Sequence, residues 1–229
     1  MILMDAITVV QKYIISKWKS SKKRWAKTSS LYLKMGGKLL EKLWSIANIS
    51  LGAIISRKKA KTEIEIKAKY KLFSMKSYEE DLSKEEYEDF ESNDILNDKL
   101  VKEGDLIFRL LYPLKVVYVT KELEGLLVPS QYCIIRVTNK NYDAKFLKWY
   151  LESTEVDKQV TPFLMNTVMP LITVKSIKEL EIPKVELEKQ RLVGKIIMNW
   201  YKEKRLVKQL LIEKEKYYNE NIKKLLGGK

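Results

Sequence analysis

The chain has 229 residues, with 44 Lys and Arg against 30 Asp and Glu, and its formal net charge is +14. One cysteine and no histidine exclude a Ser-His-Asp triad, a Cys-His dyad, a zinc site with histidine ligands and a disulfide framework. The length allows about one and a half domains, and the positive excess favours nucleic acid or an acidic membrane surface as partner, although a Lys-rich proteome would also explain it.

Residues 1–40 are predicted to form a basic helical extension. The apolar run Met1–Val10 lacks the preceding positive charge of a secretory signal, and Asp5, Gln11 and Lys12 interrupt the stretch that a transmembrane helix would need. Its apolar residues recur at three- and four-residue spacings, which predicts an amphipathic helix. Such a helix packs on another helix or lies on a membrane surface, and the first is the more common.

Charge is distributed in blocks along the chain. Residues 1–60 carry thirteen Lys and Arg against two acids, whereas residues 78–105 carry twelve acids against three Lys. We expect the acidic block to face away from any phosphate backbone, and a solvated stretch without a partner is its simplest explanation. Residues 184–229 are basic again, with thirteen Lys and Arg against six Glu.

Residues 41–183 are predicted to form one domain with a curled, mostly antiparallel sheet and flanking helices. From Leu43 onward, short β-branched and aromatic runs alternate with turn signals. Residues 146–160 return to helical spacing, and Cys133 is expected to be a buried thiol in a reducing cytoplasm. The predicted strands cover residues 64–66, 70–73, 106–108, 116–119 and 132–137.

Residues 184–229 are predicted to form one long helix, because no Pro follows Pro183 and no strong breaker precedes Gly227. A seven-residue repeat of apolar positions along it predicts a coiled coil. At about 1.5 Å per residue the helix extends roughly 60 Å, so one compact domain cannot cover its apolar stripe, which requires another helix. The stripe consists of Val193, Ile197, Trp200, Val207, Leu211, Tyr218 and Leu225.

The sequence offers little for catalysis. It contains no P-loop, no dinucleotide-binding glycine motif, no acidic metal cluster at helical spacing and no Asn-Pro-Pro-Tyr or Asp-Pro-Pro-Tyr motif of amino-methyltransferases. We therefore predict a binding protein with no catalytic residue, no metal site and no cofactor of its own. A nuclease or a deaminase-like enzyme is a remote alternative.

Leu43–Leu226 resembles one half of a DNA specificity subunit of a type I restriction-modification system, namely a target-recognition domain followed by its spacer helix. The strongest match is Ile177–Ile196, where a strand ending in Ile-Pro is followed by Leu-x-x-Gln and the long helix. Further segments occur in the family's order over about 180 residues. They are Leu43–Gly52, Glu103–Phe108, Val128–Arg136 and Phe146–Ser153.

The resemblance implies an α+β fold and a cytoplasmic, non-catalytic subunit that directs a partner DNA methyltransferase to a bipartite site on duplex DNA. In that family two spacer helices pair antiparallel. With one recognition domain per chain, the arrangement expected is a homodimer through residues 187–226 reading a symmetric, interrupted target. S-adenosylmethionine is expected on the modification subunit, and a restriction subunit is an additional candidate partner.

Chemistry alone suggests which residues contact DNA. Four cations within five positions are predicted to bind phosphates: Arg57, Lys58, Lys59 and Lys61. Arg109, Lys140 and Asn141, at strand ends or turns, are candidates for base edges. Each of these is equally well explained as a solvated loop residue. The alternative function is a coiled-coil scaffold or a membrane-surface protein that uses the basic N-terminal helix.

Overall fold

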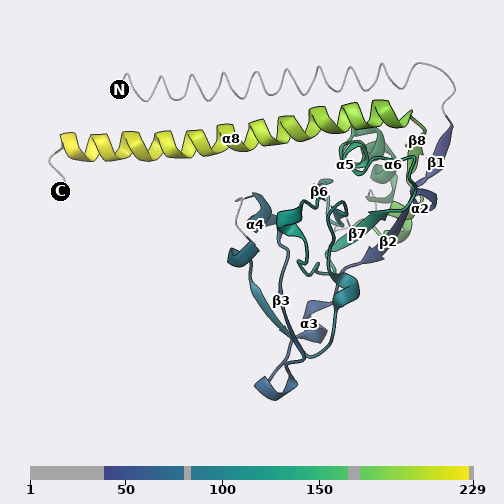
Figure 1. Cartoon of the computed structure of the whole chain (residues 1–229), viewed down its shortest axis with the longest axis horizontal. Coiled ribbons are helices and arrows are strands. Elements are labelled where there is room, and N and C mark those ends of the chain that lie inside the picture. The colour runs from purple at the N-terminus through teal and green to yellow at the C-terminus, as the bar shows by residue number, and fades with distance from the viewer. Residues whose placement is uncertain (1–38, 80–83, 165–170, 227–229) are drawn as a thin grey trace.

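The structure, a computed structural model, describes residues 39–79, 84–164 and 171–226. Its centre is an antiparallel sheet with the strand order β2-β7-β5-β6. The long helix α8 extends from this domain along one side of the molecule (Figure 1). The strands are β2 (Ala47–Leu51), β5 (Leu106–Arg109), β6 (Val116–Tyr118) and β7 (Tyr132–Val137).

Both faces of the central sheet are covered. Leu106 and Phe108 contribute to one buried cluster, whereas Ile107 between them contributes to a second cluster on the other face. Cys133 and Ile135 in β7 belong to the first cluster. The continuous apolar runs of β5 and β7 are therefore those of strands buried on two sides.

Four helices cover the first face of the sheet. Their side chains form the larger cluster together with β5 and β7. Glu152 lies between the second and third of these helices, and its Oε1 accepts a hydrogen bond from Val116 N at 2.8 Å. The helical pattern expected over residues 146–160 is thus two helices. The four are α2 (Leu43–Ile46), α5 (Ala144–Leu151), α6 (Thr154–Leu164) and α7 (Val174–Lys178).

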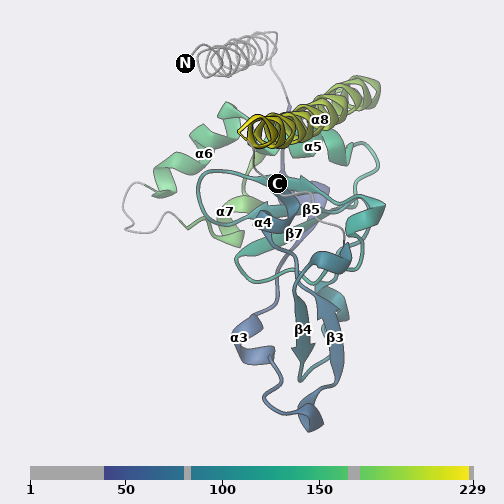
Figure 2. The ribbon, with the colours of Figure 1, turned by 90° about the vertical axis from the view of Figure 1, so that its left-hand side faces the viewer.

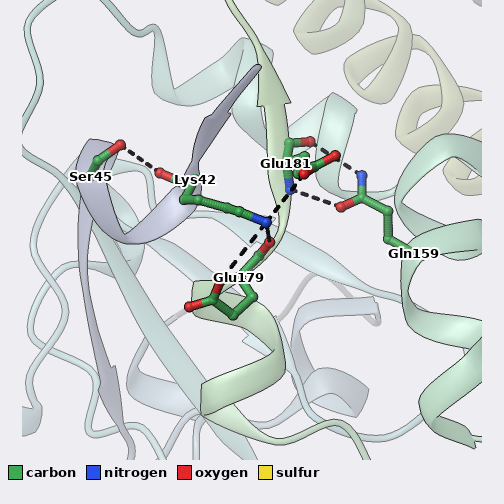
Figure 3. Close-up of polar contacts among 5 residues, drawn as sticks. All are labelled: Lys42, Ser45, Gln159, Glu179 and Glu181. Carbon is green, nitrogen blue, oxygen red and sulfur yellow. Dashed lines mark hydrogen bonds and ion pairs between the residues drawn. The ribbon is translucent and has the colours of Figure 1, made fainter.

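A two-stranded ribbon joins the two ends of this domain. It pairs β1 (Leu40–Lys42) with β8 (Glu181–Pro183). Figure 3 shows Lys42 Nζ donating to the Glu179 carbonyl at 3.1 Å and to Glu181 Oε1 at 3.2 Å. On the other side of β8, the Gln159 amide accepts from Glu181 N at 2.8 Å and donates to Glu181 O at 3.2 Å. The side chain of Gln159 therefore supplies the hydrogen bonds that a third strand would make.

A smaller lobe lies on the side of the sheet away from α8, as Figures 1 and 2 both show. We call it the distal lobe: the hairpin-like pair β3 (Ala68–Lys71) and β4 (Asp89–Ser92), with α3 (Ile55–Lys58) beside it. The strand expected over residues 64–66 is wrong. Ile64 lies in the short 3-10 helix η1 (Glu63–Glu65) and is 97% exposed, because a single apolar residue between two acids gives a sheet nothing to bury.

Short elements complete the domain. Phe73, just before α4, is buried in the second cluster together with Ile107 of β5 and Tyr132 and Ile134 of β7. The helix α4 packs its Met75 against the same cluster. The remaining elements are α4 (Met75–Glu79), η2 (Lys84–Glu86), η3 (Asn97–Lys99) and η4 (Lys121–Leu123).

The helix α8 (Leu187–Leu225) is continuous over 39 residues. Its first four turns pack against the domain: Gln190, Gly194 and Ile197 are buried, and Tyr201 is half-buried. Farther along, Lys208 Nζ donates to the carbonyl of Glu79 in α4 at 2.7 Å. The α+β architecture with a long C-terminal helix is therefore confirmed. Apart from Leu39 and Leu40, the expected extension over residues 1–40 lies outside the described residues. No helix in the described ranges is long and apolar enough to cross a membrane.

Candidate nucleic-acid interface

The predicted phosphate-binding cations lie in the distal lobe and are partly neutralised there. Lys58 Nζ is 2.6 Å from Asp94 Oδ2, and this contact lowers the pKa of the Asp94 carboxyl group below its usual value. Arg57, Lys59 and Lys61 are exposed. Lys58 is therefore occupied by a partner within the chain, whereas its three neighbours face solvent.

The acidic stretch of residues 78–105 supplies more of these partners. Across the β3–β4 pair, Lys69 Nζ lies 2.7 Å from Glu91 Oε1, and Lys71 Nζ lies 3.1 Å from Asp89 Oδ1. The stretch is thus not a solvated segment without a partner, because antiparallel pairing places it against a lysine-rich strand. The distal lobe is far less cationic than the sequence cluster alone suggests.

A second group of polar side chains lies where β5 begins and β7 ends. Asp105 is 2% exposed, and its carboxylate accepts from Arg136 Nε at 2.8 Å and from Arg136 Nη2 at 2.6 Å. Asp105 Oδ2 also accepts from Lys102 N at 2.8 Å. The carboxylate raises the pKa of the Arg136 guanidinium further. This bidentate pair fixes the guanidinium in one orientation.

The turn before Asp105 needs a glycine. Gly104 has φ of 88°, in the left-handed region, and no atom lies within 4 Å of the position that a Cβ would occupy. The turn is therefore open on its outer side. The segment Glu103–Phe108 is one of those that match the family's order, but the Arg136 partner of Asp105, 31 residues away, has no local signature in the sequence.

These residues line a depression of about 340 Å³. Lys102 and Lys140 are exposed at its edge, and neither makes an ion pair with any residue that the structure describes. Asn139 Oδ1 accepts a hydrogen bond from Asn141 N at 3.0 Å. The depression is lined by Lys102, Glu103, Gly104, Asp105, Arg136, Val137, Thr138, Asn139, Lys140, Tyr142 and Ala144.

The predicted base-contacting residues do not lie together. In the β5–β7 register Arg109 is opposite Tyr132, whereas Leu106 is opposite Ile135. Arg109 is thus at one end of the sheet, and the loop that follows β7, with Lys140 and Asn141, is at the other. Asn141 also has a structural role, because its carbonyl accepts from Gln190 Nε2 at 2.9 Å.

Gln190 anchors α8 to the domain. Its side chain is fully buried, and Oε1 accepts from Asp143 N at 2.9 Å while Nε2 donates to Asn141 O and, at 2.7 Å, to Val185 O. One turn later, a Cβ on Gly194 would lie 2.9 Å from Asp143 Oδ1. The Gln of the Leu-x-x-Gln segment and the glycine after it therefore set how closely α8 approaches α5.

A buried charged group forms a second anchor. Lys148 is 3% exposed, its Nζ lies 2.8 Å from Glu152 Oε2 and 3.6 Å from the centre of the Tyr201 ring. The Tyr201 hydroxyl donates to Glu152 Oε2 at 2.6 Å. Burial lowers the pKa of Lys148 and raises that of Tyr201. The cluster links α5, β6 and α8 through one carboxylate.

The predicted dimer stripe divides into two parts. Val193 is half-buried against the larger cluster and Ile197 is 5% exposed, so the domain itself covers these two, and they are not available to a partner helix. Trp200 is half-buried. The outer members are exposed: Val207 by 43%, Leu211 by 40%, Tyr218 by 44% and Leu225 by 86%.

A neighbouring stripe on α8 was missed in the sequence, because the seven-residue repeat is less regular there. Its members lie one position before Val193, Ile197, Val207, Leu211 and Tyr218, and they are exposed over residues 192–217. More than half of the exposed large apolar side chains that the structure describes therefore lie on α8. The second stripe consists of Leu192, Ile196, Leu206, Leu210 and Tyr217.

No protein-family model matches the sequence, and neither does any curated protein. Several solved structures share its fold, among them the following two. A chain from a structure of the type I R-M system, described for its complex assembly and conformational transition, superposes with a TM-score of 0.59 at 17% identity and covers 94% of this chain. The HsdS subunit from Thermoanaerobacter tengcongensis superposes with a TM-score of 0.55 at 18% identity and covers 80% of this chain.

This chain spans about half the length of both, 53% of the first and 46% of the second. At such identities the similarity shows the fold alone. The resemblance noted in the sequence is confirmed at that level: the domain and α8 together have the architecture of half an HsdS chain.

Proposed function

We propose that this chain is a sequence-specific DNA-binding specificity subunit of a type I restriction-modification system. The observation that supports this most is the joint match of domain and helix over 94% of the chain to about half of an R-M system chain. A sheet buried on both faces supplies a rigid support for polar loops, and α8 extends beyond it as a separate arm.

We further propose that two copies assemble through residues 187–226. The outer turns of α8 expose large apolar side chains to water, which is unfavourable in free energy. A second α8 running antiparallel would cover them. A two-fold dimer carries two recognition domains at a fixed separation, which suits a bipartite, symmetric DNA target.

The chemistry belongs to a partner in this proposal. A DNA methyltransferase subunit carrying S-adenosylmethionine would dock on the arms, with or without a restriction subunit, in the cytoplasm. The present chain would contribute no catalytic group, and its role would be to place the methyltransferase at the target sequence.

Co-purification with a candidate methyltransferase subunit, followed by mapping of methylated sites on genomic DNA, tests this function. We expect a stable complex and one interrupted, symmetric methylated motif that is absent without this chain. A complex without any sequence motif, or no complex at all, would refute the proposal. Binding to anionic vesicles without duplex binding would instead favour the scaffold or membrane-surface alternative.

A further inference from the structure

We propose that the depression beside Arg136 holds a phosphodiester group of the DNA backbone; this inference rests on the proposed function and locates the duplex on the domain. The sequence cluster Arg57–Lys61 pointed to the distal lobe instead. The two surfaces differ in how many of their cations are already paired within the chain.

The guanidinium of Arg136 is the fixed part of the site. Arginine has five N–H donors, and Asp105 accepts from one on Nε and one on Nη2. The other three have no acceptor among the described residues, and the Arg136 side chain is 40% exposed. An arginine that is held on one side and open on the other is preorganised for an anion.

The flanking groups are donors as well. Lys102 and Lys140 stand on the two segments that bound the depression. Asn139 Oδ1 accepts from Asn141 N, and the amide nitrogen of Asn139 has no acceptor among the residues that the structure describes. Asp105 balances the charge of Arg136, and Glu103 is a further carboxylate at the edge. Lys102 and Lys140 are therefore the two cations of the depression that no described carboxylate pairs with.

The distal lobe lacks this arrangement. Lys58, Lys69 and Lys71 each have a carboxylate within 3.1 Å. A phosphate would have to displace these carboxylates or rely on Arg57, Lys59 and Lys61, which no buried acceptor holds in place. Lysines without ion pairs around a fixed arginine favour the depression as the phosphate contact.

The test measures binding of a random-sequence duplex of about 30 base pairs to the full chain over a range of salt concentrations. Arg136 is left unchanged, since its loss would leave Asp105 buried without a cation. The variant is Lys102→Gln/Lys140→Gln, and the matched control is Lys175→Gln/Lys178→Gln, which removes the same charge from exposed positions of α7.

Each lysine–phosphate contact contributes about 0.9 to the slope of log K against log salt concentration. We therefore expect the variant to lower the slope by about 2 and the affinity roughly ten- to a hundred-fold near 0.1 M salt. The control should keep the slope of the unmodified chain.

An unchanged slope in the variant overturns the inference and leaves the proposed function standing. A second variant, Lys59→Gln/Lys61→Gln, tests the distal lobe. If only this second variant lowers the slope, the duplex contacts the distal lobe and the inference is wrong. If the unmodified chain binds no duplex, the proposed function itself fails. If inorganic phosphate raises the thermal midpoint of the unmodified chain but not of the variant, while the duplex slope is unchanged, the depression binds a free anion and the inference is wrong.

Discussion

Replacing Gln190 by Met removes the polar anchor of α8 while nearly preserving side-chain size. The exchange leaves one N–H and two carbonyl groups, on Asp143, Asn141 and Val185, without their present partner. Each unsatisfied buried group costs about 1–3 kcal/mol, and relaxation or entry of water recovers part of this. We expect the free energy of unfolding to fall by about 3–5 kcal/mol.

Urea denaturation followed by circular dichroism measures the loss, with the midpoint falling at an unchanged slope. Gln131→Met makes the same exchange at an exposed position in the turn before β7 and should change the free energy of unfolding by no more than about 0.5 kcal/mol. If Gln190→Met also stays within about 0.5 kcal/mol, the three hydrogen bonds do not hold the helix base and the reasoning is refuted.

Four other changes test the description. Tyr201→Phe removes a hydrogen bond to the half-buried Glu152 carboxylate and should lower the free energy of unfolding in urea denaturation by about 1.5–3 kcal/mol; no loss would mean that water replaces the hydroxyl. Gly194→Ala should lower the thermal midpoint although alanine favours helices by about 1 kcal/mol, because its Cβ would be 2.9 Å from a carboxylate oxygen; a higher midpoint would contradict this close contact. Val207→Glu/Leu211→Glu should convert the proposed dimer to a monomer in sedimentation and lower the thermal midpoint, because association stabilises the folded chain; a dimer that persists in this variant would refute the proposed assembly. Burial raises the pKa of Cys133 from 9.0 to about 12, so folding favours the neutral thiol. The free energy of unfolding should therefore fall by up to about 1.4 kcal/mol per pH unit above pH 9. Rapid alkylation of the folded chain near pH 8 would contradict this burial, because it would show that the thiol is accessible.

The strands that were predicted correctly are those whose sequence signal is strong in itself. Residues 106–108 and 132–135 are apolar on both faces, and such short, β-branched and aromatic runs are typical of strands covered on both sides. Residues 64–66 have only the alternation of apolar and acidic residues, and a short helical turn with Ile64 exposed and Ile66 half-buried satisfies that pattern equally well. Local patterning is thus reliable where burial is two-sided and unreliable where one residue carries it.

The candidate site was harder to predict because its charges are arranged by long-range pairing. Lys58 is adjacent to Lys59 in sequence, yet only Lys58 meets a carboxylate, which comes from a turn 36 residues later. Arg136 was not predicted as a site residue, because its role depends on its pairing with the buried Asp105. The register of the strands decides which cations have a carboxylate partner, and this register cannot be derived from the composition of a segment.

The two anchors at the base of α8 determine how precisely the far end of the helix is positioned. At about 1.5 Å per residue, the 39 residues extend about 58 Å, so tilting the base by one degree moves the far end by about 1 Å. Three degrees of tilt corresponds to about one base-pair step of 3.4 Å. Gln190 and the Lys148–Glu152–Tyr201 cluster therefore fix the direction of α8 at its base. In the proposed dimer, loosening either would broaden the range of distances between the two recognition domains.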